Sequence, residues 1–261
     1  PASTSLGDAD VEWFDTGAPT VAGAGAAVAG AGDVDGDGLA DILVGAKGNT
    51  DGGRAAGAAF LLLASNAMVG GALTSADAEY TGSAGDAAGA ALGGAGDVNG
   101  DGYADLLIGG YGNDDGGTDA GAAWLVLGGP APTSASLTAA DAEYTGPNNG
   151  GMAGITVAAA GDVDRDGYGD LVIGAYVDSD AALFAGAAYL VRGGPAPTSD
   201  SLGAAAAKYT GEALYDYAGC AVSSARDFDA DGYDDVIVGA YWNDEGAADA
   251  GAAYLILGSG P

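Results

Sequence analysis

Acidic residues at alternate positions of one short stretch are the feature of this sequence with the clearest chemistry. The stretch Gly32–Asp41 reads GDVDGDGLAD and carries four carboxylates, on Asp33, Asp35, Asp37 and Asp41. No Lys or Arg lies among them to relieve their mutual repulsion. A calcium ion would relieve it, because calcium takes roughly six to eight oxygen ligands and tolerates irregular geometry. The intervening glycines permit the positive φ angles that a loop needs to curl around one ion.

The same pattern returns three more times along the chain at nearly constant spacing. The further copies are Gly96–Asp105 (GDVNGDGYAD), Gly161–Asp170 (GDVDRDGYGD) and Arg226–Asp235 (RDFDADGYDD). The first aspartates of successive copies lie 64 or 65 residues apart. A fixed period of this size predicts repeated supersecondary units. Repetition also favours a metal site over a single solvated acidic turn.

An EF-hand is the nearest competing interpretation of the D-x-D-x-D-G pattern. An EF-hand loop requires a glutamate at position 12. The four stretches instead have β-branched apolar residues at that position, namely Val44, Ile108, Ile173 and Val238. Such residues are typical of strands. The pattern therefore predicts a calcium loop that leads into a strand, and it excludes the EF-hand.

Each unit contains four short segments that we expect to form strands around its acidic loop. The first segment is rich in small residues and precedes the loop: Gly25–Ala31, Gly89–Ala95, Gly154–Ala160 and Gly219–Ala225. The second is apolar and follows the loop: Ile42–Val44, Leu106–Ile108, Leu171–Ile173 and Val236–Val238. The third begins Gly-Ala-Ala: Gly57–Leu63, Gly121–Leu127, Gly186–Arg192 and Gly251–Leu257. The fourth is Ala78–Gly82, Ala142–Gly146 and Ala207–Gly211.

Short strands between Gly- and Asp-rich turns predict an all-β protein built of antiparallel sheets. Radial repetition of four-stranded sheets is a β-propeller. We therefore predict one domain, residues 1–261, of four four-stranded blades whose small first strands line the narrow centre. The blade repeats run over about 18–82, 83–146, 147–211 and 212–261, and residues 1–17 complete the last one.

The N-terminal residues resemble the segments that lead into fourth strands elsewhere in the chain. They match Pro130–Leu137 and its counterpart one repeat later. Asp10–Gly17 is therefore the expected fourth strand of the last blade. In it, Trp13 or Phe14 takes the place that tyrosine has in the fourth strands of the other repeats. We expect it to pair with Gly251–Leu257 and close the ring, because closure removes a sheet edge. Two chains sharing eight blades, and an unclosed piece of a longer array, are the less favoured alternatives.

The charge balance restricts the partners of this chain. Its 261 residues include 37 acidic and 6 basic side chains, which give a net charge of −31. Nucleic acid and anionic membrane surfaces would be repelled. Bound divalent cations, a high-salt environment and solubility all fit such an excess, and four calcium ions would neutralise only part of it.

The composition gives little support to an enzyme. The chain has no His, so it cannot form a Ser-His-Asp or Cys-His arrangement. The single cysteine, Cys220, has no partner for an intrachain disulfide and lies in an apolar stretch, where we expect a small buried side chain. No apolar run is long enough to span a bilayer, and no basic-then-apolar N-terminus is present. We expect a soluble mature domain or an excised part of a longer protein.

The repeated unit resembles the FG-GAP repeat of the integrin α-subunit head and its bacterial relatives, over nearly the whole chain. The Phe-Gly half of that motif corresponds to Ala24-Gly25, Ala88-Gly89, Ala153-Gly154 and Ala218-Gly219. The Gly-Ala-Pro half corresponds to Gly45-Ala46-Lys47, Gly109-Gly110-Tyr111, Gly174-Ala175-Tyr176 and Gly239-Ala240-Tyr241. Phe and Pro are replaced in every copy, so the resemblance rests mainly on the acidic loop followed by an apolar strand and glycine. It implies a β-propeller with calcium in the turn between strands one and two.

The resemblance also implies which residues of each loop bind the metal. In the first loop they are the side chains of Asp33, Asp35, Asp37 and Asp41 and the carbonyl of Leu39. Their counterparts are Asp97, Asn99, Asp101, Tyr103 and Asp105; Asp162, Asp164, Asp166, Tyr168 and Asp170; and Asp227, Asp229, Asp231, Tyr233 and Asp235. Because Asn99 is uncharged and Arg165 partly offsets its acidic neighbours, we expect the second and third sites to bind more weakly.

We expect the four Ca²⁺ ions to be structural and the protein to be extracellular or on the cell surface. Extracellular calcium modules have dissociation constants of roughly 0.1–1 mM, so such sites would be nearly empty at cytosolic calcium levels. On the face opposite the calcium turns, the loops carry Tyr111, Tyr176, Tyr215, Tyr217, Tyr241 and Trp242. Aromatic residues beside Asp and Asn suit recognition of a protein or a sugar, although they could equally cap the blade edges.

The integrin-like resemblance favours a protein partner, and hence an adhesion or protein-binding module. Carbohydrate binding, as in fungal lectins with similar repeats, is the runner-up. A scaffold repeat without a ligand is the third possibility.

Overall fold

A computed structural model of the chain describes residues 9–14, 23–64 and 70–260, and strands make up nearly all of its regular structure. The helices in these ranges are three short 3-10 turns, at Leu73–Ser75, Leu137–Ala139 and Leu202–Ala204. None of them is long and apolar enough to cross a membrane. The expected all-β class is confirmed for this part of the chain.

Each predicted repeat forms one antiparallel sheet, numbered here I to IV. Sheet I contains β2 (Ala24–Gly32), β3 (Asp41–Ala46), β4 (Ala58–Leu62) and β6 (Ala78–Thr81). Sheet II contains β7 (Ala91–Gly96), β8 (Asp105–Gly110), β9 (Ala122–Val126) and β11 (Ala142–Thr145). Sheet III contains β12 (Thr156–Gly161), β13 (Asp170–Ala175), β14 (Ala187–Val191) and β16 (Ala207–Thr210). Sheet IV contains β17 (Ala218–Arg226), β18 (Asp235–Ala240) and β19 (Ala252–Ile256).

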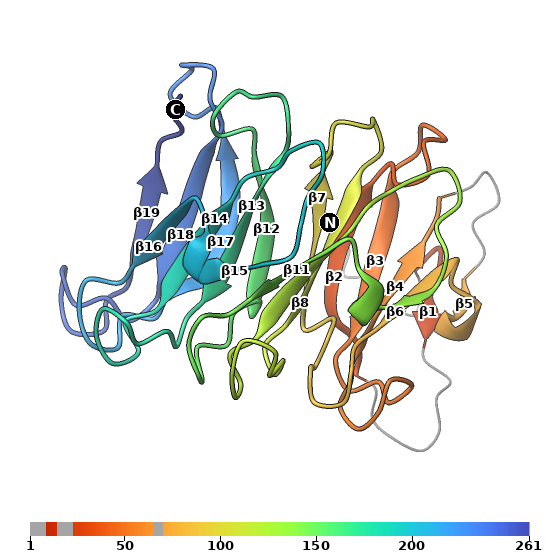
Figure 1. The fold of residues 1–261 in the computed structure, drawn as a ribbon, viewed down its shortest axis with the longest axis horizontal. Coiled ribbons are helices and arrows are strands. Elements are labelled where there is room, and N and C mark those ends of the chain that lie inside the picture. Colours follow the sequence, from red (N-terminus) through yellow and green to blue (C-terminus); the bar gives the residue numbers. More distant parts are fainter. Residues whose placement is uncertain (1–8, 15–22, 65–69, 261) are drawn as a thin grey trace.

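The four sheets stand side by side in one array (Figure 1). Their first strands, β2, β7, β12 and β17, are neighbours in that order. A buried apolar layer fills each gap between sheets, with Leu43 and Leu61 of sheet I against Ile108 and Trp124 of sheet II. Equivalent layers join sheet II to sheet III and sheet III to sheet IV. This arrangement fits a propeller, in which each blade buries its faces against its two neighbours.

The glycine one residue before the end of the second strand is required by the close approach of the next sheet. A Cβ added to Gly45 would lie 2.2 Å from the carbonyl oxygen of Gly89. At Gly109 the carbonyl oxygen of Gly154 would lie 2.0 Å away. No side chain fits at such distances, so these positions need glycine even though their φ angles are ordinary.

Two very short strands link neighbouring sheets through parallel pairs, and two more form a parallel pair of their own. β10 (Ala135–Ser136) pairs with β6 of the preceding sheet, and β15 (Asp200–Ser201) pairs with β11 in the same way. β5 (Gly71–Ala72) instead pairs with β1 (Trp13–Phe14). The three pairs are equivalent in register. In each pair one strand, β5, β10 or β15, begins two residues before the leucine of a 3-10 turn. β1 therefore occupies the position of a fourth strand belonging to a sheet ahead of sheet I.

The predicted closure of the ring is wrong for the described residues. Of the expected strand Asp10–Gly17, residues 15–17 lie outside the described ranges, and β1 pairs with β5 rather than with Gly251–Leu257. β1 and β19 lie at opposite ends of the array (Figure 1), so one strand cannot reach both. Within the described part of the chain, β19 pairs with β18 alone, and sheet IV has three strands instead of the expected four.

Candidate metal centres and the opposite face

The four acidic stretches form the turns between the first and second strands of the four sheets. They connect β2 to β3, β7 to β8, β12 to β13 and β17 to β18. Because the sheets stand side by side in the same orientation, all four turns lie along one edge of the array, the upper edge in Figure 1. The repeat therefore places the candidate ligands in four equivalent sites.

The first aspartate organises each turn by accepting hydrogen bonds from the backbone. In the first turn, Asp33 accepts from the amides of Gly36 at 2.9 Å and Gly38 at 3.0 Å. Asp37 accepts from the amide of Leu39 at 2.8 Å. Gly36 and Gly38 have φ angles of 77° and 89°, which carry the backbone around the carboxylates.

Three of the four turns bring three carboxylates together tightly enough to share one ion. In each of these turns, one oxygen from each of three carboxylates lies within 4.8 Å of the other two. The groups are Asp33, Asp35 and Asp37; Asp162, Asp164 and Asp170; and Asp227, Asp229 and Asp231. An all-oxygen donor set of carboxylates is what calcium prefers. The residues present therefore fit a bound Ca²⁺ at three of the four turns.

The second turn lacks such a group because an amide replaces one carboxylate. The side-chain amide of Asn99 donates to the carboxylate of Asp101 at 2.9 Å, and the backbone N–H of Asp101 donates to Asn99 Oδ1 at 3.0 Å. Asp97 still accepts from three backbone amides, including Gly102 at 2.9 Å. The turn keeps its shape with two carboxylates on the loop. Its electrostatic attraction for a cation is therefore weaker than that of the three other turns.

The last aspartate of each turn is buried and holds the turn in place through two backbone hydrogen bonds, and we call it the brace. Asp105 is fully buried, and its two oxygens accept from the amides of Val98 at 2.7 Å and Gly128 at 2.9 Å. Asp41, Asp170 and Asp235 make the same pair of bonds in their own sheets. Burial raises the pKa of Asp105 to about 6, and it raises the pKa of Asp170 to about 6 by the same cause.

Three of the four bracing aspartates stand apart from the carboxylate clusters. Each bracing aspartate ties the turn to the second residue after the third strand, so both of its oxygens already have backbone donors. Asp41, Asp105 and Asp235 lie outside the three-carboxylate groups of the described residues, and Asp170 lies inside one. A carboxylate oxygen has further lone pairs, so a ligand role for the braces stays a prediction.

Arg192, rather than Arg165, offsets the charge of the third turn. Its Nε lies 3.0 Å from Asp164, whose side chain is only 5% exposed. Arg165 instead lies over the ring of Tyr233 in the next turn, 5.5 Å from its centroid. Arg192 follows the third strand at the position where the other repeats have leucine, Leu63, Leu127 and Leu257. Comparing the repeats position by position would have singled it out.

The tyrosines of the turns also have a packing role that the sequence did not indicate. The ring of Tyr103 lies against Gly36 of the preceding turn, where an added Cβ would be 2.7 Å from the ring. Tyr168 lies against Gly100 in the same way. Each ring therefore buttresses the turn before it, while the backbone amides of Tyr103 and Tyr168 donate to Asp101 and Asp166.

Aromatic side chains gather at the opposite edge, over sheets III and IV. Tyr217 lies at the centre, with ring centroids 5.3 Å from Tyr241 and 5.2 Å from Trp242. Tyr176, Tyr215 and also Phe184, which the sequence did not single out, contact the same group. We refer to these six residues as the aromatic cluster. Tyr111 makes no ring contact with the described aromatic residues.

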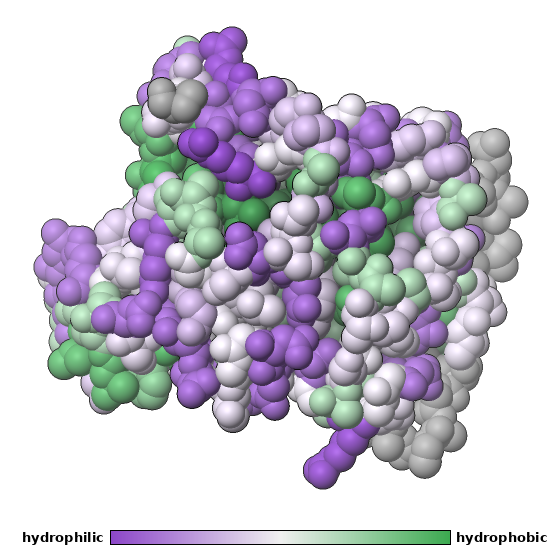
Figure 2. Space-filling model, viewed as in Figure 1, coloured by the Kyte–Doolittle hydropathy of each residue, from purple (hydrophilic) through white to green (hydrophobic). Residues whose placement is uncertain are grey.

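The aromatic cluster is partly open to solvent. Tyr215, Tyr241 and Trp242 are 42%, 47% and 44% exposed, and Leu183 and Leu214 beside them are exposed as well. Figure 2 shows hydrophobic residues at the lower left of the view, where Figure 1 has the loops of sheets III and IV. Five of the six aromatic residues expected at this edge therefore lie together over sheets III and IV, whereas Tyr111 of sheet II stands apart from them.

Tyr215 has a backbone conformation that the other repeats reserve for glycine. Its φ is 66°, and Gly85 and Gly150 occupy the equivalent position with φ of 102° and 70°. A bulky side chain at positive φ is disfavoured. Sites of this kind concentrate where a side chain serves binding.

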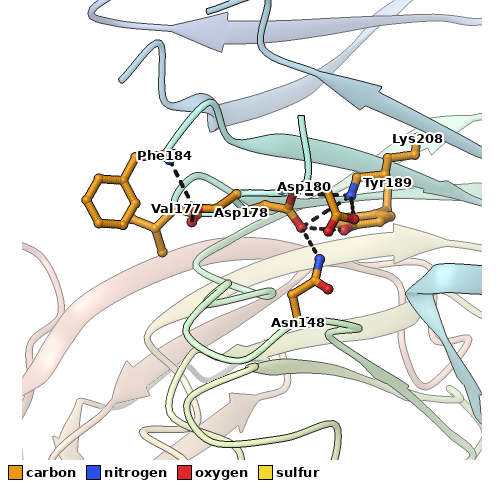
Figure 3. A network of polar contacts seen from close by, with 8 residues as sticks. Asn148, Val177, Asp178, Asp180, Phe184, Tyr189 and Lys208 are labelled. Atoms are coloured by element: carbon orange, nitrogen blue, oxygen red, sulfur yellow. Dashed lines mark hydrogen bonds and ion pairs between the residues drawn. The ribbon is translucent and has the colours of Figure 1, made fainter. Parts of the chain in front are cut away.

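A polar network lies beneath the same edge at each loop between the second and third strands. In sheet III, Lys208 contacts Asp178 at 3.1 Å and Asp180 at 2.6 Å (Figure 3). The buried Asp178 also accepts from Tyr189 at 2.8 Å and Asn148 at 2.9 Å. The hydrogen bond from Lys208 lowers the pKa of Asp180.

Sheet II has a glutamate where sheet III has Lys208. Burial, together with the nearby Asp115, raises the pKa of Glu143 to about 7. One of its oxygens, Oε1, is buried with no hydrogen-bond partner. Glu143 and Asp115 of sheet II therefore form an acid pair that is stabilised when it holds a proton. In sheet III the positive charge of Lys208 neutralises the corresponding carboxylates.

Comparison with known proteins agrees with this geometry. The FG-GAP repeat family matches residues 17–62, 88–126 and 218–256. Integrin alpha-PS2 of Drosophila melanogaster is 32% identical over 160 residues, which are 57% of this chain and 11% of that protein. The chain thus spans about a tenth of the length of this relative. Sheet III lies outside the matched ranges, yet its strands and acidic turn have the same arrangement as those of the matched repeats.

Proposed function

Since this chain is an FG-GAP repeat protein similar to an integrin α subunit, we propose that it is a calcium-stabilised β-propeller module that binds a protein partner. The similarity points to an adhesion-type module and away from catalysis. The observation that carries the calcium part is the clustering of three carboxylates in equivalent turns. We propose that all four turns bind Ca²⁺, the second most weakly.

In this proposal the ligands are the alternating side chains of each turn with one backbone carbonyl. For the first turn these are Asp33, Asp35, Asp37 and Asp41 and the carbonyl of Leu39. Bound Ca²⁺ supplies positive charge that cancels the repulsion within the turn. Each turn joins the two inner strands of its sheet, so metal binding stabilises the native array relative to the unfolded chain. Sites of this kind fill at millimolar calcium, which supports an extracellular or cell-surface location.

The aromatic cluster is the proposed protein-binding surface. Tyr and Trp are the residues most often found at the energetic centre of protein interfaces. Here Tyr215, Tyr241 and Trp242 are exposed, the rings are contiguous, and Tyr215 has a strained backbone. The surrounding loops are acidic, so the partner surface that fits is apolar or aromatic with a basic rim.

Native mass spectrometry with added calcium tests the metal part. We expect up to four Ca²⁺ per chain, with the last ion binding most weakly, and the replacement Asp227→Asn should remove one ion. A chain that binds no calcium at millimolar concentration would overturn this part of the proposal. The replacement Asp119→Asn, in a loop at the opposite edge, is the matched control and should leave the count unchanged.

Partner binding is tested by comparing two equivalent tyrosines. Tyr241 and Tyr111 follow the second strand in sheets IV and II, but only Tyr241 belongs to the aromatic cluster. We expect Tyr241→Ala to abolish capture of protein partners from an extracellular fraction and Tyr111→Ala to leave it intact. Equal effects of the two replacements would contradict the assignment, and binding to a glycan array alone would replace the protein partner with a carbohydrate.

A further inference from the structure

The two ends of the array present apolar side chains that nothing in the described structure covers. At the sheet IV end, Phe228, Ile237 and Leu255 are 71%, 38% and 41% exposed. At the sheet I end, Val28 is 70% exposed. Figure 2 shows hydrophobic residues exposed near β19, at the left end of the array. Exposed apolar faces of this kind mark interaction surfaces.

The repeat shows what such faces contact. The counterparts of Phe228, Ile237 and Leu255 in sheet I are Val34, Leu43 and Leu61, which are 1%, 0% and 0% exposed. These residues are buried because sheet II packs on them. The counterparts in sheets II and III are buried in the same way by the next sheet. The free face of sheet IV is therefore built to receive another sheet of this repeat.

The face of sheet I that carries the exposed Val28 is the complementary surface. The counterparts of Val28 are Leu92, Val157 and Val222, and each packs against the sheet that precedes it. Each internal interface thus joins the outgoing face of one sheet to the incoming face of the next. Within the described residues, the outgoing face of sheet IV has no partner. On the incoming face of sheet I, Trp13 of β1 packs with Phe60 and Leu62, as the fourth strand of a preceding sheet would, and Val28 stays exposed.

Gly239 gives independent evidence that sheet IV is built to receive another sheet. Its counterparts Gly45, Gly109 and Gly174 have to be glycine because the backbone of the next sheet lies within 2.2 Å of an added Cβ. Around Gly239 the nearest atom would be 3.4 Å away, so an alanine would fit in the described structure. A glycine is required there only if a first strand such as β2 approaches it.

β1 supplies the element that sheet IV lacks. Its register with β5 places Glu12, Trp13 and Phe14 at the positions of Glu79, Tyr80 and Thr81 in sheet I. In sheet I the amide of Asn49 donates to Glu79 at 3.5 Å. Sheet IV has Asn243 at the position of Asn49, whereas sheet III pairs Asp178 with Lys208. Sheets I and II, which also have an asparagine at this position, both carry a glutamate on the fourth strand, Glu79 and Glu143, and β1 carries Glu12 in the same place.

We propose that a second copy of this chain closes the array, with β1 of each copy serving as the fourth strand beside β19 of the other. The incoming face of sheet I of one copy then covers the outgoing face of sheet IV of its partner. Both junctions of the resulting two-chain ring are identical head-to-tail contacts, and they reuse the packing already present between the sheets of one chain. A head-to-tail contact forms a closed ring when its rotation closes and an open filament when it does not, so a species of two chains distinguishes the ring from a filament.

The oligomeric state of the wild-type chain and of two leucine variants tests this proposal. We expect sedimentation equilibrium in calcium to give the mass of two chains. Leu255→Lys places a charge in the junction and should raise the dissociation constant at least tenfold, because it removes the burial of one leucine. Leu214→Lys is the matched control: Leu214 is 56% exposed but lies beside the aromatic cluster, so the dimer should persist. A monomeric wild type, or an open-ended series of larger species, would overturn the two-chain ring.

A cysteine pair tests which strands meet. In sheets I and II the antiparallel partners Thr81 and Ala58, and Thr145 and Ala122, join the fourth strand to the third. The equivalent residues at the junction are Phe14 and Ala252, so the double variant Phe14→Cys/Ala252→Cys should form disulfide-linked dimers under mild oxidation. Neither single variant should do so. A disulfide within one chain would show that the chain closes on itself and would reject the second copy.

Discussion

The replacement Asp105→Asn separates the structural role of the last aspartate in each turn from its proposed role as a metal ligand. Asp105 is fully buried, and each of its oxygens accepts one backbone amide hydrogen bond, from Val98 and from Gly128. An asparagine has the same shape but only one acceptor oxygen. Its amide group would face the second backbone N–H, which would then be buried without an acceptor.

The cost of this change follows from the two bonds. A buried polar group left without a partner costs about 1–3 kcal/mol, and bonds to a charged acceptor are the stronger ones. We therefore expect Asp105→Asn to lower the free energy of unfolding by about 2–4 kcal/mol. At about 2–4 °C per kcal/mol for a chain of this size, the melting temperature falls by about 4–16 °C. Because the bonds do not involve metal, this loss should be present in EDTA.

Asp101→Asn is the matched control in the same turn. Asp101 is exposed, and an asparagine at this position can still accept from the amide of Tyr103. In EDTA this variant should melt within about 2 °C of the wild type, since surface replacements usually change stability by no more than about 0.5 kcal/mol. Thermal unfolding by circular dichroism in EDTA and in calcium checks both variants. If Asp105→Asn melted with the wild type in EDTA, the bracing role would be refuted.

Three further outcomes follow from the same structure. Removing calcium with EDTA should lower the melting temperature by several degrees in calorimetry. Four sites with dissociation constants of about 0.1–1 mM contribute roughly 2–6 kcal/mol to the free energy of unfolding at about 1 mM calcium. An unchanged melting temperature would count against structural calcium. Arg192→Leu, which restores the residue found in the other repeats, should tighten calcium binding at the third turn by removing the cation beside Asp164, and unchanged affinity in calorimetric titration would exclude that competition. Because the folded pKa of Glu143, about 7, exceeds its ordinary 4.5, the proton it holds stabilises the fold fully below about pH 4.5 and this contribution is lost as pH rises through 7. Glu143→Gln should therefore be more stable than the wild type by about 1–3 kcal/mol at pH 8 in urea unfolding, and the advantage should vanish near pH 5; parallel curves at the two pH values would show that Glu143 does not titrate in this range.

Much of the local structure could be predicted from the sequence because the residues that specify each turn and strand lie within the same repeat. The alternation of Asp and Gly specifies the turn, and the apolar run ending in glycine specifies the strand after it. The observed strands β3, β8, β13 and β18 each contain the predicted second-strand residues. The acidic turns were found for the same reason, since all of their candidate ligands lie within ten residues of one another.

Contacts between repeats could not be predicted in this way. The backbone donors to Asp105 include Gly128, which is 23 residues away, and the ring of Tyr103 packs on a turn in another repeat. The pairing of Arg192 with Asp164 depends on where the third strand ends above the turn. Sequence proximity favoured Arg165, but its side chain is directed toward Tyr233 instead.

The sequence by itself determined the repeat, the position of its turns and the all-β class, because these depend on residues close together in the chain and on the chemistry of alternating carboxylates. Only the tertiary structure decided how the repeats meet at the two ends of the array. The N-terminal segment was recognisable as a fourth strand, but its match to β6 and β11 could not say which sheet it joins. That choice depends on the rotation between neighbouring sheets, which is set by the packing of many side chains across each interface, and it leaves β1 and β19 at opposite ends of the array.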